Sequence, residues 1–100
     1  MKRKSVKWTN RAVESLDLFC AHIHKDSPAA ASRVKKEIIQ TAKKLSANPE
    51  MYQLDDVFAG TELNIRRFFR WSYKIVYQVL DNDVVILDVF HTSMGDSEEE

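Results

Sequence analysis

Hydrophobic residues recur at helical spacing in two segments of the first half of the chain, after a short alternating stretch at residues 5–9 that predicts a strand. In the first segment the apolar positions lie three and four residues apart: Ala12, Val13, Leu16, Phe19, Cys20 and Ile23. In the second they form one stripe: Ala31, Val34, Ile38, Ala42 and Leu45. Between them, Ser27 and Pro28 are typical of a helix N-cap and first turn. We therefore expect two antiparallel helices, the first ending near residue 24, with a short connection.

The second half of the chain is typical of β-strands. Residues 62–69, 72–80 and 84–91 are rich in β-branched and aromatic side chains, whereas residues 50–61 show no period and predict a loop. The predicted order is β-α-α-β-β-β. This order indicates an α+β fold, in which an N-terminal strand and an αα-hairpin precede three antiparallel strands. The helices must bury their apolar stripes on one face of a twisted antiparallel sheet, which leaves the other face open.

The last two predicted strands define which side chains share a face. A three-residue turn at residues 81–83 would place Tyr73 opposite His91 and, on the other face, Lys74 opposite Phe90. We expect the Tyr73 side to lie under the helices and the Lys74 side to be open. A two-residue turn would move each partner by one position and separate Tyr73 from His91.

Three arginines precede Lys74, and two of them are adjacent. Adjacent residues point to opposite faces of a regular strand, so that Arg66 or Arg67 should share the open face with Lys74. Arg70 follows, and aromatic residues are interleaved with all three: Phe68, Phe69 and Trp71. This pattern is typical of surfaces that stack on nucleic acid bases and contact phosphates. It is equally typical of a sheet with a solvated side and an aromatic core.

Length and charge extend this interpretation. With 100 residues, 44% of them hydrophobic, the chain predicts one domain at residues 1–95 and an acidic tail at residues 96–100 that we expect to be flexible. Fifteen basic and eight acidic side chains give residues 1–80 a formal charge of +7, and seven acids give the last twenty residues −7. The tail is either simply solvated or screens a basic working surface.

Several classes of protein are not supported by the sequence. There is neither an apolar run near the roughly 20 residues that cross a bilayer nor a secretory signal, so we expect no membrane association. The single cysteine, Cys20, cannot form an internal disulfide, and we expect a cytoplasmic protein. Cys20 and His24 alone do not make a zinc site, and we expect neither a metal nor a cofactor.

Four segments carry a resemblance to a known family: WTNRAVESL at residues 8–16, SPAAA at 27–31, ANPEMY at 47–52 and YKIVYQVLDNDVVILDVFH at 73–91. The chain resembles the RelE/ParE superfamily of toxins from bacterial type II toxin–antitoxin, or plasmid stabilisation, systems. The last segment is the most specific. The resemblance implies an αα-hairpin on a twisted sheet and a protein that inhibits growth until an antitoxin from an adjacent gene neutralises it. A homodimer and a toxin–antitoxin hetero-oligomer are both compatible with it.

The superfamily contains two activities. ParE-like members poison DNA gyrase, and the DVFH ending and the SPAAA segment resemble this branch slightly more. The resemblance then implies target-binding residues on and beside the open face: Arg66, Arg67, Arg70, Tyr73 and Lys74. RelE-like members are the alternative. They cleave mRNA on the ribosome without a metal.

In a ribonuclease, Lys74 and Arg67 or Arg66 would contact the phosphate, and His91 would act as the acid or base. The alternative interpretation is that His91 has a structural role as the partner of Tyr73. The segment after His91 is acidic and lacks the basic residues of RNA-cleaving relatives, and an acidic segment repels RNA. A third alternative is an inactive remnant that still binds an antitoxin.

Overall fold

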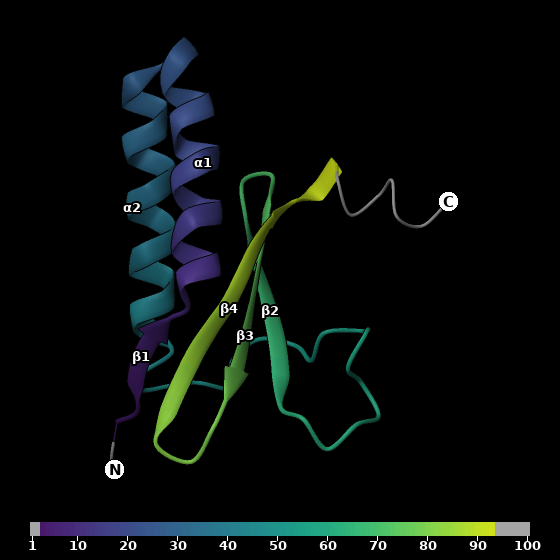
Figure 1. The fold of residues 1–100 in the computed structure, drawn as a ribbon. Helices are drawn as coiled ribbons and strands as arrows, with labels where there is room; N and C mark the ends of the chain where they lie inside the picture. The colour runs from purple at the N-terminus through teal and green to yellow at the C-terminus, as the bar shows by residue number, and fades with distance from the viewer. Residues whose placement is uncertain (1–2, 94–100) are drawn as a thin grey trace.

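The computed structural model describes residues 3–93, so that the predicted acidic tail lies outside the described residues. The elements follow the predicted order: β1 (Ser5–Trp8), α1 (Asn10–Asp26), α2 (Pro28–Lys44), β2 (Ile65–Arg70), β3 (Tyr73–Val79) and β4 (Asp83–His91). The two helices lie side by side and form one layer against the sheet (Figure 1). The predicted α+β fold with a helix-covered sheet is confirmed. Neither helix has the length and apolar character that crossing a bilayer requires.

The sheet has the strand order β1-β4-β3-β2. The last three strands are antiparallel, as predicted, but β1 pairs with β4 in parallel, which makes the sheet mixed. The parallel pairing follows from the αα-hairpin, which returns the chain to the end of the molecule where β1 began. A long loop and two antiparallel strands then bring β4 between β3 and β1.

One residue joins the two helices. The backbone N–H of Ser27 donates to the Ile23 carbonyl at the end of α1, and its hydroxyl accepts from the Ala30 N–H at 3.1 Å at the start of α2. Thr9 caps α1 in the same way, accepting from the Ala12 N–H at 3.0 Å. These caps satisfy N–H groups that a helix start leaves without partners. The short connection is therefore confirmed, although α1 extends two residues beyond the predicted end.

The core lies between the helices and the covered face of the sheet. The predicted stripe of the second helix is entirely buried: Ala31, Val34, Ile38, Ala42 and Leu45. It packs with the covered-face residues of the strands, among which Phe68, Ile75 and Tyr77 are at most 2% exposed. The hydroxyl of Tyr77 reaches the far side of this core and donates to the Pro49 carbonyl at 2.9 Å.

The β3–β4 hairpin combines a shorter turn than predicted with a β-bulge. The Leu80 N–H donates to the Asp83 carbonyl at 2.8 Å, so that the turn has two central residues and the predicted three-residue turn is wrong. The register shifts between Val76 and Tyr77, which leaves Leu87 of β4 without a partner. One extra residue in β4 compensates for the shorter turn.

Beyond the bulge, the predicted pairs are restored. Tyr73 lies opposite His91, and Lys74 lies opposite Phe90, as expected from the sequence. Between the turn and the bulge, the pairs are displaced by one residue. Tyr77 pairs with Ile86, whereas a three-residue turn would have placed it opposite Leu87. The pairs at the Tyr73–His91 end of the hairpin were therefore predicted correctly, although the predicted turn length was wrong.

The loop that connects α2 to β2 covers part of the edge of the sheet. The Asp55 N–H donates to the Ile65 carbonyl at 2.9 Å, and the Arg67 N–H donates to the Gln53 carbonyl at 3.1 Å. Residues 53–55 thus run antiparallel to β2 as a short additional strand, with a bridge between Leu54 and Arg66. The loop satisfies the backbone groups of an edge strand and brings its side chains over the open face.

Candidate functional site

The basic residues around position 70 are divided between the two faces of the sheet. Arg67 pairs with Val76, and Lys74 pairs with Phe69, which places both cations on the open face. Arg66 and Arg70 pair with Tyr77 and Tyr73 on the helix-covered side. The prediction that one of the adjacent arginines shares the open face with Lys74 is therefore confirmed for Arg67. Target binding by these residues stays a prediction.

The open face is hollowed by a cavity of about 550 Å³. Apolar side chains of the three antiparallel strands line it: Phe69, Val76, Leu87 and Phe90. Residues 55–58 of the long loop form another wall, and Arg67, Lys74 and Asp88 add charged groups. The cavity thus has an apolar lining with charges around it, as small binding sites commonly do.

Lys74 is held by an acid from the loop. Its Nζ lies 3.0 Å from Oδ2 of Asp55, a residue that is only 2% exposed. The other carboxylate oxygen of Asp55 accepts from the Val57 N–H at 2.9 Å. Lys74 therefore neutralises a buried carboxylate, and the carboxylate fixes the loop against the open face.

Arg67 is held by the same loop. Its Nη1 donates to the Leu54 carbonyl at 3.0 Å, and its Nη2 lies 4.0 Å from Oδ2 of Asp56. The guanidinium carbon also lies 5.6 Å from the centre of the Phe69 ring, within cation–π range. Asp55 and Asp56 were not predicted as site residues, because the loop has no period. Two adjacent acids in the otherwise uncharged residues 51–61 were the only signal.

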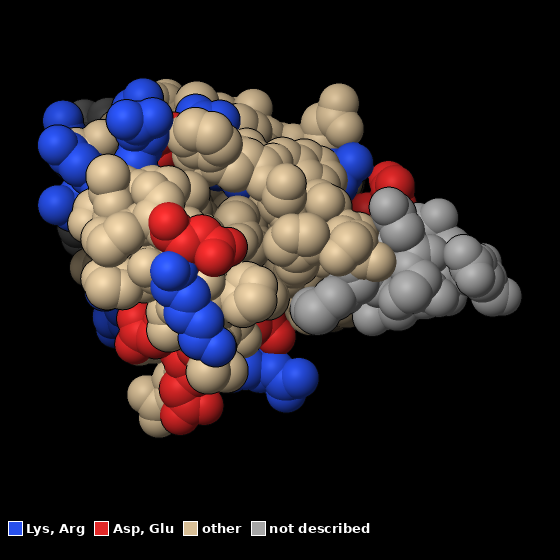
Figure 2. Space-filling view, turned by 90° about the horizontal axis from the view of Figure 1, so that it is seen from above, with Lys and Arg blue, Asp and Glu red and all other residues tan. Residues whose placement is uncertain are grey.

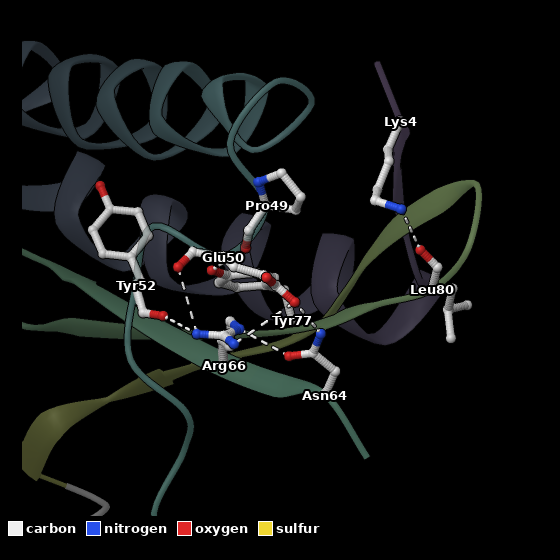
Figure 3. A network of polar contacts seen from close by, with 8 residues as sticks. All are labelled: Lys4, Pro49, Glu50, Tyr52, Asn64, Arg66, Tyr77 and Leu80. Atoms are coloured by element: carbon white, nitrogen blue, oxygen red, sulfur yellow. Dashed lines mark hydrogen bonds and ion pairs between the residues drawn. The ribbon is translucent and has the colours of Figure 1, made fainter. Parts of the chain in front are cut away.

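Arg66 fastens the beginning of the loop to the sheet. Its Nε donates to Oδ1 of Asn64 at 2.8 Å, its Nη1 donates to the Tyr52 carbonyl at 2.6 Å, and its Nη2 lies 3.8 Å from Glu50 (Figure 3). Burial raises the pKa of the adjacent Tyr77 to about 12, although the Arg66 charge opposes this shift. The guanidinium N–H groups of Arg66 thus contact other residues of the same protein chain.

His91 packs into an aromatic cluster on the covered side. Its ring lies 5.2 Å from Tyr73, edge to face, and 6.3 Å from Phe19, and its Nδ1 lies 2.6 Å from the Ser93 hydroxyl. Burial, and then the charge of Cys20, raise the pKa of Tyr73. His91 borders the cavity, but its ring lies with Tyr73 and away from the side chains of Lys74 and Arg67. The three candidate catalytic residues are therefore not on one face.

A family comparison identifies the chain. A family model described as the ParE toxin of the type II toxin–antitoxin system parDE matches residues 6–95. The chain belongs to the ParE toxin family. It is 35% identical over 91 residues to Y4kP of Sinorhizobium fredii strain NBRC 101917 / NGR234, a candidate toxin by its name, and the match covers 91% of each chain.

Two solved structures share the fold of this ParE-family chain. A chain of the chromosomal ParDE toxin–antitoxin system from P. aeruginosa superposes with a TM-score of 0.70 at 21% identity, covering 89% of this chain and 96% of that one. A chain of the RelBE2 toxin–antitoxin complex from Mycobacterium tuberculosis gives a TM-score of 0.58 at 24% identity, covering 89% and 98%. At these identities the superpositions establish the fold alone.

Asp88 of this ParE-family chain is a second acid that sequence patterns did not reveal. It is 8% exposed and accepts from Arg11 Nε and the Ser15 hydroxyl of α1, each at 2.8 Å, and from the Val89 N–H. It therefore ties α1 to β4 beyond the point where β1 ends. The signal available was an acid at an otherwise apolar strand position.

The charges around the cavity do not form the uniformly basic platform that the sequence suggested. Two cations, Arg67 and Lys74, face three carboxylates, Asp55, Asp56 and Asp88, among the described lining residues. In Figure 2, Lys and Arg side chains gather at the upper left, and in other parts of the face shown they lie beside Asp and Glu. Within residues 3–93 no three His, Cys, Asp or Glu side chains gather closely enough to hold a metal ion.

Proposed function

We propose that this ParE-family protein is the toxin of a type II toxin–antitoxin pair and inhibits growth by binding to and poisoning DNA gyrase. The family match over residues 6–95 supports the general assignment. A single observation supports binding over RNA cleavage. Lys74 is paired with the buried Asp55 at 3.0 Å, while the His91 ring lies with Tyr73 on the other side of the sheet.

Metal-independent RNA cleavage requires a base, a cation and an acid around one phosphate. A phosphate that approached Lys74 would have to compete with a carboxylate already in contact with it, and two further carboxylates border the same cavity. Because these carboxylates offset the nearby cations, such a surface attracts a polyanion only weakly. Apolar side chains with paired charges around them are instead compatible with a protein partner, because protein interfaces have an apolar centre and a polar rim.

The ribonuclease alternative has one observation in its favour, since Arg67 and Lys74 do share the open face. If the loop moved away on the ribosome, both cations would be exposed together. This alternative requires that residues 53–58 leave β2 and break the Asp55 contacts before any cleavage.

Two parallel assays separate these functions. The purified protein is incubated with DNA gyrase and supercoiled plasmid, and separately with ribosomes translating a defined mRNA. We expect cleaved DNA held by gyrase and no new 3′ ends in the mRNA by primer extension. Cut mRNA with unaffected gyrase would establish the alternative, and no effect in either assay would indicate an inactive remnant.

We further propose that an antitoxin encoded by the adjacent gene binds and neutralises this protein. The RelBE2 structure, a toxin–antitoxin complex by its title, has the same fold. Premixing with the adjacent gene's product is the control for both assays, because it should abolish the activity. If the protein encoded by the adjacent gene neither bound the toxin nor restored the activity of gyrase, this part of the proposal would be contradicted.

A further inference from the structure

The turn between β2 and β3 holds a residue in a conformation that suits it poorly. Arg70 pairs with Tyr73, so that Trp71 and Ser72 are the two central residues of the turn. Trp71 has φ = 56°, and it is the only described residue other than glycine with a positive φ. A positive φ at the first central position alone is the pattern of a type II′ turn, in which glycine is preferred. A tryptophan here strains the backbone.

The Trp71 side chain is largely exposed despite this strain. Trp71 is 57% exposed, and within residues 3–93 its ring makes no aromatic or cation–π contact. Its neighbour Phe69 is 47% exposed. A strained and exposed aromatic side chain is explained if the indole contributes free energy in a complex.

Arg70 is the second unexplained group of the turn. Unlike Arg66, Arg67 and Lys74, it has no ion pair with any described residue, and its Nη1 donates only to the Phe69 carbonyl next to it in the chain. A cation without an internal partner beside an exposed indole matches the residue types that dominate binding energy at protein interfaces.

We propose that the β2–β3 turn, residues 69–72, is the element with which this toxin contacts its target protein. The Trp71 indole enters an apolar pocket of the target, and Arg70 pairs with a carboxylate beside that pocket. This inference rests on the proposed function and takes gyrase as the target. A protein fits better than a nucleic acid, since the turn offers a single cation without an ion pair among the described residues.

The turn is also held in place before binding. The Thr92 N–H, just after β4, donates to the Ser72 carbonyl at 2.8 Å, so that the end of a third strand supports the turn. The turn lies at the end of the sheet where β4 finishes, opposite the β3–β4 turn (Figure 1). A rigid anchor loses little conformational entropy on binding.

Four variants test the proposal: Trp71→Gly, Trp71→Ala, Arg70→Ala and the control Leu18→Ala, which removes a 72% exposed apolar side chain from α1. Affinity for gyrase is measured by calorimetry, and thermal unfolding is measured for each protein. We expect both Trp71 variants to bind at least about 30-fold more weakly, and Leu18→Ala to bind like the wild type. Trp71→Gly should melt above Trp71→Ala, because glycine relieves the turn.

Equal affinity of the wild type and Trp71→Gly for gyrase would overturn the inference and leave the proposed function intact. A wild-type protein that does not bind gyrase would overturn both. A single-stranded oligonucleotide is the second probe. If the Trp71 variants lost affinity for it and not for gyrase, the turn would be a nucleic-acid contact and the inference would be wrong.

Discussion

On the covered face of the sheet, Phe68 lies against Tyr52 and Tyr77 and is 2% exposed, whereas Phe69, the next residue, is 47% exposed on the open face. Arg66 and Arg67 are equally exposed but lie on opposite faces of the strand. Arg66 holds the start of the loop through a hydrogen bond to the Tyr52 carbonyl, while Arg67 contacts the loop and the Phe69 ring at the cavity. Identical residue types one position apart therefore have different surroundings, because the alternation of the strand directs them to opposite faces.

The difference between the two faces shows which part of the protein stabilises the fold and which part is open to a binding partner. The covered face contributes most of the buried core. The open face keeps exposed apolar groups and a cavity, but its cations are already paired with acids of the loop. The open face is therefore not a uniformly basic surface.

The largest expected difference between the faces is that of the two phenylalanines. Phe68→Ala should reduce the free energy of unfolding by about 4 kcal/mol, because it leaves a cavity among Tyr52, Tyr77 and their neighbours. Phe69→Ala is the matched control and should cost less than about 1 kcal/mol. Urea unfolding of both variants measures the two values. Similar losses would show that the faces do not differ as described.

A smaller loss is expected on the open face, where Lys74 pairs with the buried Asp55. Lys74→Met should cost about 2–3 kcal/mol, because it leaves a carboxylate that is 3% exposed without its cation, although Lys74 itself is partly solvated. Adding Asp55→Asn removes the unpaired charge and should recover at least half of the loss. Chemical denaturation of the single and double variants gives the coupling between the two sites. A Lys74→Met protein as stable as the wild type would contradict the pairing.

The smallest effect concerns the Tyr77 hydroxyl on the covered face. Tyr77→Phe removes the hydrogen bond to the Pro49 carbonyl and should cost about 1 kcal/mol at pH 8. Because burial raises the pKa of Tyr77 to about 12 in the folded protein, the folded state holds this proton more tightly than the unfolded chain. The wild type should therefore lose stability as the pH rises from 10 to 12, by at most about 1.4 kcal/mol per pH unit.

The difference between the wild type and Tyr77→Phe is the measurement for this effect, since other groups that titrate in alkali are common to both proteins. Denaturation at several pH values between 8 and 12 should show that the advantage of the wild type shrinks above pH 10. A constant difference over this range would show that Tyr77 ionises as readily in the folded protein as in the unfolded chain.

Much of the fold was predictable because its determinants are local. Ser27 and Pro28 end one helix and begin the next within one residue, and the apolar stripe of residues 31–45 needs only its spacing to define a buried face. Strand alternation likewise predicted that Tyr73 and Lys74 lie on opposite faces. Each of these features depends on side chains within a few positions of one another.

By itself, the sequence determined the helices, the strands and the opposite faces of Tyr73 and Lys74, since caps and periodicity act over short distances. Only the tertiary structure decided that β1 pairs in parallel with β4, that Leu87 forms a bulge and that Asp55 neutralises Lys74. These features join residues that are far apart in the chain, or come from a loop without a period. Their energies arise from burial and pairing after the chain has folded, which no local pattern encodes.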